Sequence, residues 1–393
     1  MKNPTKENKW INGALPALLI HSCIGSVYCW SLFKGDIAKA MNIPVSEIEA
    51  AFMIAIFCLG MSAAFGGRFV EKNVRWSSLV STCCFSAGLV GSVLSIYWGN
   101  KWLLFLSYGI MMGIGLGIGY ISPVKTLMIW FKSTPGLATG IAISGFGLSK
   151  ALFSPFIEWS VPLNGINVTL LSMAFISIVC MLIATFFIKK PAAWVESSHK
   201  FSVKDAIEVI TDRKYLTIWF MFFTNITCGL VIISFEKNIV SSTSLASSIA
   251  IISSASAAFN TLGRFGYATF SDYFKQKTVI YTIILFSSLA ACLIVVFTGL
   301  SWVSALIILW VVNLGYGGGF STLPNILHGQ FGLARLSTIH GLALSAWAWA
   351  SVASYIISQV FIYRMGYGFE DTCMILGGLY AIAFLLSFYS RKK

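Results

Sequence analysis

The sequence predicts an all-α membrane protein of twelve transmembrane helices, arranged as two pseudo-symmetric six-helix bundles. Hydrophobic residues make up 57% of the 393 residues and charged residues only 10%, whereas about a quarter of the residues in a soluble domain are charged. Windows of about twenty apolar residues, the length that crosses a bilayer, recur along the whole chain. The chain also aligns with itself at one fixed spacing.

Each helix is expected from one apolar window. The windows begin near Trp10, Ser46, Arg75, Trp102, Gly136 and Leu163 in the first half, and near Tyr215, Leu245, Thr278, Trp302, Leu336 and Glu370 in the second. The first window follows a basic segment like that of a signal peptide, but its apolar stretch is too long and lacks a small-residue cleavage pattern. We therefore expect it to be retained as the first helix.

A spacing of 201 residues relates the two halves of the chain. It aligns, without a gap, Glu71 with Asp272, Pro123 with Pro324, Gly140 with Gly341 and Ser144 with Ser345. A parallel repeat of this kind is typical of transporters whose halves move around a central site. We expect an N-terminal bundle over 1–189, a cytoplasmic linker with a short amphipathic helix over 190–213, and a C-terminal bundle over 214–393. Ser202 is the expected N-cap of the linker helix.

The positive charge of the chain is a signal of membrane topology. The net charge of +13 could indicate a nucleic-acid partner, so the position of each cation matters. Twenty Lys and Arg residues fall in the tails and in the connections on the same side, and only five fall on the opposite side. Because basic residues concentrate in cytoplasmic loops, we expect a multi-pass protein of the cytoplasmic membrane with both termini cytoplasmic. No nucleic-acid partner is expected.

One permanent cation, Arg264, lies inside a predicted helix. It precedes Asp272 by eight residues, which places it roughly 12 Å inside the membrane. A guanidinium at that depth is costly unless it meets a partner or water, and all fourteen acidic residues are expected in loops or at helix ends. The pattern therefore indicates that the counter-ion is a bound solute. The alternatives are bonds from Arg264 to backbone carbonyls, or extension of its side chain toward Asp272.

Other polar and aromatic residues are candidates to line the same cavity. Lys150, roughly 21 Å deep in the fifth helix, is either a second anion ligand or extends to the outer interface, and Lys125 is expected to extend to the inner interface. His21 is a candidate for proton coupling because imidazole changes charge near neutral pH, with a packing role as the alternative. The aromatic candidates, each with helix packing as its alternative, are Tyr28, Trp30, Tyr120, Tyr316, Phe320, Trp347 and Trp349.

Several segments together carry a family resemblance. They read GSVYCWSLF in the first helix, GIGLGIGYISP in the fourth, NITCGLVII in the seventh, NTLGRFGYATFSD in the eighth and HGLALSAW in the eleventh. This combination resembles the major facilitator superfamily, and within it the branch of the oxalate/formate antiporters. The resemblance implies transport by alternating access around a central site. It also implies that Arg264 binds the transported anion.

The resemblance further implies a substrate class. Members of the branch that carry the oxalate dianion have a lysine in the eleventh helix, and HGLALSAWAWASVASYI contains none. A site with one cation favours a monocarboxylate such as formate, lactate or pyruvate, unless Lys150 supplies the second charge that a dicarboxylate needs. The expected protein is a secondary active transporter of small organic anions working by exchange. The alternatives are a proton-coupled symporter and a non-transporting membrane sensor on the same fold.

A gating segment is expected after the second helix. The superfamily motif is reduced there to GGRFVEKNVR, and the expected gating residues are Arg68, Glu71 and Lys72, with Asp272 at the equivalent place in the second half. No enzymatic activity, cofactor or metal site is expected, because the pattern shows no clustered acids, metal-ligand spacing or nucleophile beside a base. We expect the protein to act as a monomer.

Overall fold

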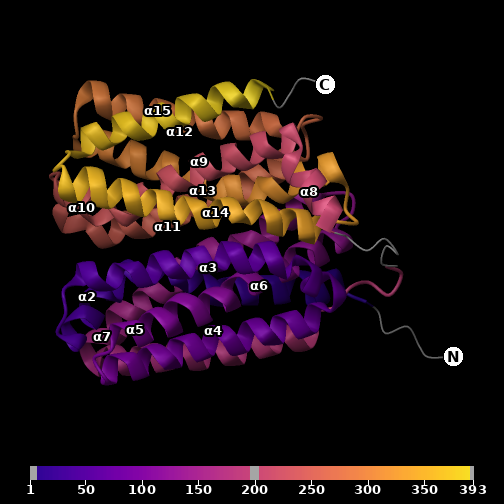
Figure 1. Ribbon diagram of the computed structural model, residues 1–393, viewed down its shortest axis with the longest axis horizontal. Coiled ribbons are helices and arrows are strands. Elements are labelled where there is room, and N and C mark those ends of the chain that lie inside the picture. The colour runs from indigo at the N-terminus through magenta and orange to yellow at the C-terminus, as the bar shows by residue number, and fades with distance from the viewer. Residues whose placement is uncertain (1–6, 195–202, 390–393) are drawn as a thin grey trace.

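The structure, a computed structural model, describes residues 7–194 and 203–389, apart from the side chains of Arg68, Glu71, Val203, Ala250 and Tyr389. These residues form two helical bundles that lie against each other along their length (Figure 1), and no strand occurs among them. The predicted fold class, twelve helices in two bundles, is confirmed.

The N-terminal bundle contains six of the predicted spans, some of them made of consecutive helical pieces. Its elements are η1 (Trp10–Ala14), α1 (Leu15–Ile24), η2 (Gly25–Cys29), α2 (Trp30–Met41), α3 (Val45–Lys72), α4 (Val74–Tyr97), α5 (Lys101–Leu104), η3 (Phe105–Met111), α6 (Met112–Trp130) and α7 (Pro135–Phe187). The first span, η1 to α2, is continuous across a 3-10 segment that carries Tyr28.

The C-terminal bundle contains the other six spans. Its elements are α9 (Arg213–Ser234), α10 (Glu236–Ser241), η4 (Ala246–Ser248), α11 (Ile249–Ser271), α12 (Thr278–Thr298), α13 (Trp302–Phe331), α14 (Leu336–Ile357), η5 (Ser358–Arg364) and α15 (Phe369–Tyr389). The linker between the bundles forms α8 (Val203–Thr211), with Asp205 in its first turn. Its expected N-cap, Ser202, lies outside the described residues.

The element α7 contains two of the twelve spans. A straight helix of 53 residues would be about 80 Å long, far more than a bilayer needs. At Gly165 the backbone leaves the helical region, with φ 77° and ψ 167°, and the chain turns back. The end of α7 consequently lies beside the start of the chain, where the Asn12 side chain donates a hydrogen bond to the carbonyl of Phe187.

Ten described helices have the length and composition of membrane spans. This number treats α7 as a single span, and it does not include α11, the helix that carries Arg264. Figure 1 shows that η1 begins and α15 ends at the same end of the molecule. We call this end the termini side and the opposite end, where α2 and α10 lie, the distal side.

Small residues bring the two bundles close together along two helix pairs. Gly67 of α3 packs on the backbone of Ser337 in α14, and Gly136 of α7 packs on the backbone of Ala268 in α11. The spacing of 201 residues relates Gly67 to Ala268 and Gly136 to Ser337, so the two contacts are pseudo-symmetric. Such small side chains allow helix backbones to approach within a membrane.

Candidate functional site

Arg264 lies in the middle of α11, in the interface between the bundles, and its side chain is fully buried. Its Nε donates a hydrogen bond to Oδ1 of Asn260, one turn earlier, at 2.8 Å. Neither terminal nitrogen, Nη1 or Nη2, has a hydrogen-bond partner among the described residues. The guanidinium therefore makes neither of the contacts given as alternatives, to backbone carbonyls or to Asp272.

Six aromatic residues form one connected cluster of rings beside this guanidinium, and we call them the aromatic cage. They are Tyr28, Tyr120 and Phe146 from the N-terminal bundle, and Tyr316, Phe320 and Trp347 from the C-terminal bundle. The guanidinium carbon lies 5.3 Å from the ring centre of Phe146 and 5.1 Å from that of Phe320, within the range of a cation–π interaction. Both bundles thus contribute to the surroundings of one charge.

The cage leaves several hydrogen-bond donors without acceptors. Among the described residues, no hydrogen-bond partner is found for the hydroxyl of Tyr120, the indole nitrogen of Trp347 or the terminal nitrogens of Arg264. Leaving a buried donor unpaired costs about 1–3 kcal/mol, and more for a charged group. A carboxylate is acceptor-only and has about four lone-pair positions. An anion among these donors would satisfy the arginine and its neighbours together.

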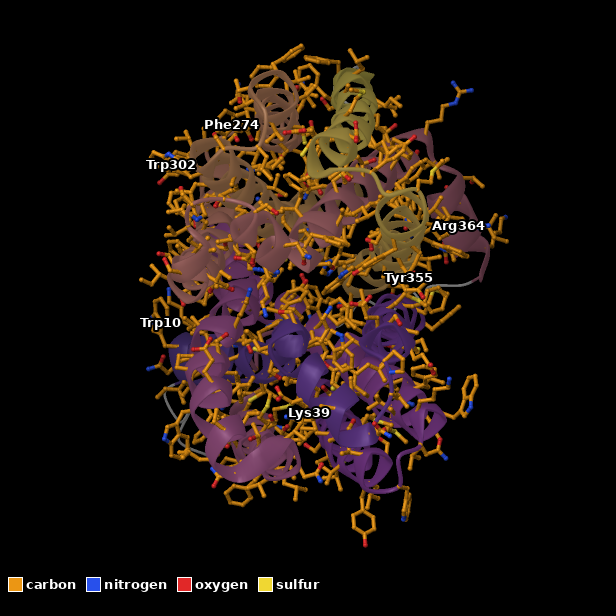
Figure 2. All side chains as sticks on the ribbon, turned by 90° about the vertical axis from the view of Figure 1, so that its left-hand side faces the viewer. Trp10, Lys39, Phe274, Trp302, Tyr355 and Arg364 are labelled. Carbon is orange, nitrogen blue, oxygen red and sulfur yellow. The ribbon has the colours of Figure 1, made fainter. Side chains whose placement is uncertain are left out.

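The distal side has a cavity of about 790 Å³ between the bundles. It is lined by residues of η2, α2 and α3 on one side and of α9, α14 and η5 on the other, and Tyr28 and Trp30 belong to its lining. Figure 2 looks onto this side, and Tyr355, one of the lining residues, lies there near the boundary between the bundles. The hydroxyls of Tyr28 and Tyr316 are 2.7 Å apart. This pair joins the two bundles at the place where the distal cavity meets the cage.

The structure brings five of the seven predicted aromatic residues into the cage. Trp30 instead packs on Tyr108, with ring centres 4.7 Å apart, and lies along the distal cavity. Trp349, a candidate for either the central cavity or helix packing, does not line the cavity, because its side chain is 51% exposed and contacts Phe57 on the outside of the bundles. The two tryptophans of α14 differ because Trp347 and Trp349 lie on different faces of one helix.

Sequence reasoning missed two residues around Arg264. Phe146 faces Trp347 in the cage with ring centres 5.9 Å apart, and the spacing of 201 residues relates these two positions. The internal repeat could therefore have identified Phe146. Asn260 precedes Arg264 by four residues, a spacing that places two side chains on the same face of a helix.

Lys150 forms an ion pair that was not expected. Its Nζ lies 3.3 Å from Oε2 of Glu236, the first residue of α10, and both side chains are largely buried. Glu236 lies at a helix end, as expected of every acidic residue of the chain, but it is buried there. Lys150 also lines a smaller cavity of about 300 Å³, together with Tyr28, Gly147 and Asn260. We call this space the side cavity.

His21 and Lys125 are both buried. The His21 ring nitrogens lie 3.0 Å from the carbonyl oxygen of Ala17 and 3.2 Å from that of Tyr120. Lys125 does not extend to the membrane surface as expected, because its Nζ donates a hydrogen bond to the carbonyl of Ala334 at 3.0 Å. This contact crosses from α6 to the loop before α14 and joins the bundles on the termini side.

Asp272 also joins the bundles on the termini side. Its carboxylate accepts hydrogen bonds from the backbone N–H groups of Gly136 at 2.8 Å and Leu137 at 3.0 Å, at the first turn of α7. Thr134, the N-cap residue of α7, provides no side-chain cap, so an acid from the other bundle satisfies these backbone donors. Lys72 is exposed, and the side chains of Arg68 and Glu71 are outside the described part of the chain.

Replacing Asp272 by Asn is expected to weaken closure of the termini side. Hydrogen bonds to a charged group contribute about 1.5–3 kcal/mol, so the closed state should lose about one order of magnitude or more in population. Labelling of a cysteine introduced at Ser337 measures this opening. Asp212→Asn is the matched control, because Asp212 caps the N-terminus of its own helix α9 through Tyr215 N–H at 2.9 Å. Equal labelling of the two variants would contradict the gating role.

Comparisons with known proteins agree with this architecture. A family model described as Major Facilitator Superfamily matches residues 17–355. The chain is 26% identical to the uncharacterised MFS-type transporter YhjX of Escherichia coli (strain K12), covering 86% of this chain and 84% of that protein. It is 23% identical to the oxalate:formate antiporter of Oxalobacter formigenes, covering 88% and 83%. A crystal structure of the E. coli fucose:proton symporter FucP shares the fold, with TM-score 0.73, 14% identity and coverage of 97% and 98%.

Proposed function

The chain belongs to the major facilitator superfamily, and we propose that it is a secondary active transporter of small organic anions, with monocarboxylates as its main substrates. One observation carries the proposal. Arg264 is fully buried between the bundles, and its terminal nitrogens have no partner among the described residues. An anionic substrate supplies the missing counter-charge, and the planar fork of arginine suits a carboxylate held through two parallel hydrogen bonds.

The surroundings of Arg264 favour a small substrate with one negative charge. The cage rings exclude water, and this strengthens the attraction between the guanidinium and an anion. The hydroxyl of Tyr120 and the indole of Trp347 are available to donate to the same carboxylate. Lys150, which lines the side cavity, is already neutralised by Glu236. Formate, lactate and pyruvate fit this description.

Alternating access supplies the transport mechanism. In this conformation, Lys125 and Asp272 hold the bundles together on the termini side, while the distal cavity lies between the bundles on the other side. Since the cage takes residues from both bundles, a rocking motion would move the site between the two sides of the membrane. With both termini in the cytoplasm, as the distribution of basic residues predicts, the present conformation faces outward. We place a monomer of the protein in the cytoplasmic membrane.

Exchange of one anion for another is the transport mode we favour. An empty carrier would have to change conformation with an uncompensated guanidinium in a water-poor interface, which is costly. A carrier loaded with an anion avoids that cost in both directions, so return with a second anion is the faster step. The resemblance to the oxalate:formate antiporter of Oxalobacter formigenes supports the same mode. Proton coupling through His21 stays a prediction.

Binding of carboxylates to the purified protein tests the substrate class. Formate, lactate and pyruvate are expected to raise the melting temperature in a concentration-dependent way, since a ligand that binds the folded state stabilises it. Lactamide and pyruvamide are the matched controls, because they keep the shape of the substrates without the charge.

Exchange is tested in proteoliposomes. Preloading with an unlabelled monocarboxylate should accelerate uptake of the labelled form from the outside. Stabilisation by the amides as strong as that by the acids would contradict an anion site, and uptake independent of any internal anion would contradict the exchange mode.

A further inference from the structure

The ion pair between Lys150 and Glu236 lies between the two bundles on the distal side. Lys150 belongs to α7 of the N-terminal bundle and Glu236 to α10 of the C-terminal bundle. Glu236 is the only acidic residue that is buried in the described part of the chain, with 6% of its surface exposed. One carboxylate oxygen, Oε2, faces Lys150 at 3.3 Å, whereas the other, Oε1, is buried without a hydrogen-bond partner among the described residues.

The pair adjoins the anion site. Lys150, Tyr28 and Asn260 line the side cavity, and Asn260 accepts the hydrogen bond from Nε of Arg264. Gly147, one turn before Lys150 on α7, packs directly on Arg264, since a Cβ there would lie 3.2 Å from Cδ of the arginine. Lys150 is therefore about one helical turn along α7 from the residue that touches the guanidinium. A ligand longer than one carboxylate could extend from Arg264 into the side cavity.

The charges of this region add to one net positive unit. Arg264 and Lys150 are cations, and Glu236 cancels one of them. The elements that pack against α10 add no further acid. The charged residues of α9, Arg213 and Lys214, lie at its termini-side end, α11 contributes only Arg264, and α13 has no Asp, Glu, Lys or Arg. On α10 itself Lys237 is exposed, as is Glu158 on α7.

From these contacts we infer that Lys150 is a second anion ligand, masked by Glu236, and that Glu236 thereby restricts the transporter to monovalent anions. The inference rests on the proposed function, because it assigns the substrate charge of that same site. A dicarboxylate with one end on Arg264 would place its second carboxylate at Lys150, beside the carboxylate of Glu236. Like charges at that separation repel strongly in a water-poor interface, so the second carboxylate is rejected.

Replacing Glu236 by Gln tests this assignment. Glutamine keeps the shape of the side chain and removes its charge, so the Lys150 ammonium becomes available to a ligand. The affinity for malonate and succinate relative to that for formate and pyruvate should rise about tenfold or more, because one repulsive charge is removed near the second carboxylate. Isothermal titration of the purified protein measures both classes of ligand. Glu236→Ala provides a second variant if the glutamine variant is unstable.

The double variant Glu236→Gln with Lys150→Met separates a ligand role from a structural one. Without the ammonium, the dicarboxylate gain should disappear while monocarboxylate binding through Arg264 persists. A pair that only holds the bundles together would instead change the affinities for both classes by the same factor. Glu158→Gln, an exposed neutralisation on the same helix as Lys150, should leave the preference unchanged.

Two results would overturn the inference. The first is that both Glu236→Gln and Glu236→Ala keep the preference of the wild type for monocarboxylates over dicarboxylates. The second is that the increase in dicarboxylate affinity persists when Lys150 is replaced. Failure of the proposed function looks different, since the wild-type protein would then bind neither mono- nor dicarboxylates. If the wild-type protein binds monocarboxylates and the Glu236 variants keep the same preference for them over dicarboxylates, the role of Glu236 is contradicted while the proposed function still holds.

Discussion

Replacing Arg264 by Gln is expected to abolish anion uptake while the protein still folds and inserts. The substitution removes the one cation in the cage and leaves the carboxylate of the substrate buried without a counter-charge. Truncating one member of a buried charge pair costs about 2–5 kcal/mol, which is about thirtyfold or more in affinity. Uptake of labelled formate or pyruvate into proteoliposomes measures the loss.

The same variant should be at least as stable as the wild type in the absence of substrate. Arg264 is buried, and its terminal nitrogens have no hydrogen-bond partner within the described ranges 7–194 and 203–389. An uncompensated buried charge destabilises the folded state. The melting temperature without ligand should therefore stay equal or rise, while the stabilisation by monocarboxylates disappears. This combination distinguishes loss of a ligand contact from general misfolding.

Arg264→Lys is the matched control for the arginine. Lysine keeps the positive charge but loses the planar fork and the Nε–H that Asn260 holds. We expect intermediate uptake, below that of the wild type and above that of the glutamine variant. Wild-type rates of uptake in Arg264→Gln would show that the substrate binds elsewhere.

Replacing Gly67 by Ala is expected to cause the second large loss of transport. A Cβ at this position of α3 would lie 2.7 Å from Cα of Thr338 and 2.8 Å from the carbonyl oxygen of Ser337, both in α14. Because backbone atoms cannot move aside as a flexible side chain does, the bundles must separate on the termini side. Overpacking of this kind costs about 1–3 kcal/mol, which shifts a two-state equilibrium by about 5- to 150-fold.

Gly66→Ala provides a control at the neighbouring residue. A Cβ there would meet only the side chains of Ile118 at 3.6 Å and Ile121 at 4.0 Å, both in α6 of the same bundle, and these are ordinary contacts. We expect near wild-type uptake from Gly66→Ala, and strongly reduced uptake from Gly67→Ala together with greater labelling of cysteines placed on the termini side. If both glycine variants transport equally well, close contact between α3 and α14 is not required for the cycle.

Local physical chemistry was sufficient to predict the helices and their grouping. A span needs about twenty apolar residues because a bilayer offers the backbone no hydrogen-bond partners, and this requirement is visible in each window. The twelve predicted starts accordingly correspond to helices, including the two joined in α7. The lack of a counter-ion for Arg264 could also be predicted, because this arginine lies inside an apolar window and no acidic residue is expected at its depth.

Packing between the bundles decided which side chains meet. In a membrane, the face of a helix toward lipid is as apolar as the face toward another helix, so apolar periodicity does not show where Trp347 and Trp349 point. Tertiary contacts place Trp347 in the cage with Phe146 and leave Trp349 outside.

A helical membrane protein with a cation in its interior could be predicted from the residues alone, because both features follow from residue types and their spacing along one helix. Three-dimensional packing was needed to show that Glu236 neutralises Lys150 and that no described residue neutralises Arg264. These pairings join residues of different elements, and an ion pair depends on distances in space that spacing along the chain does not specify.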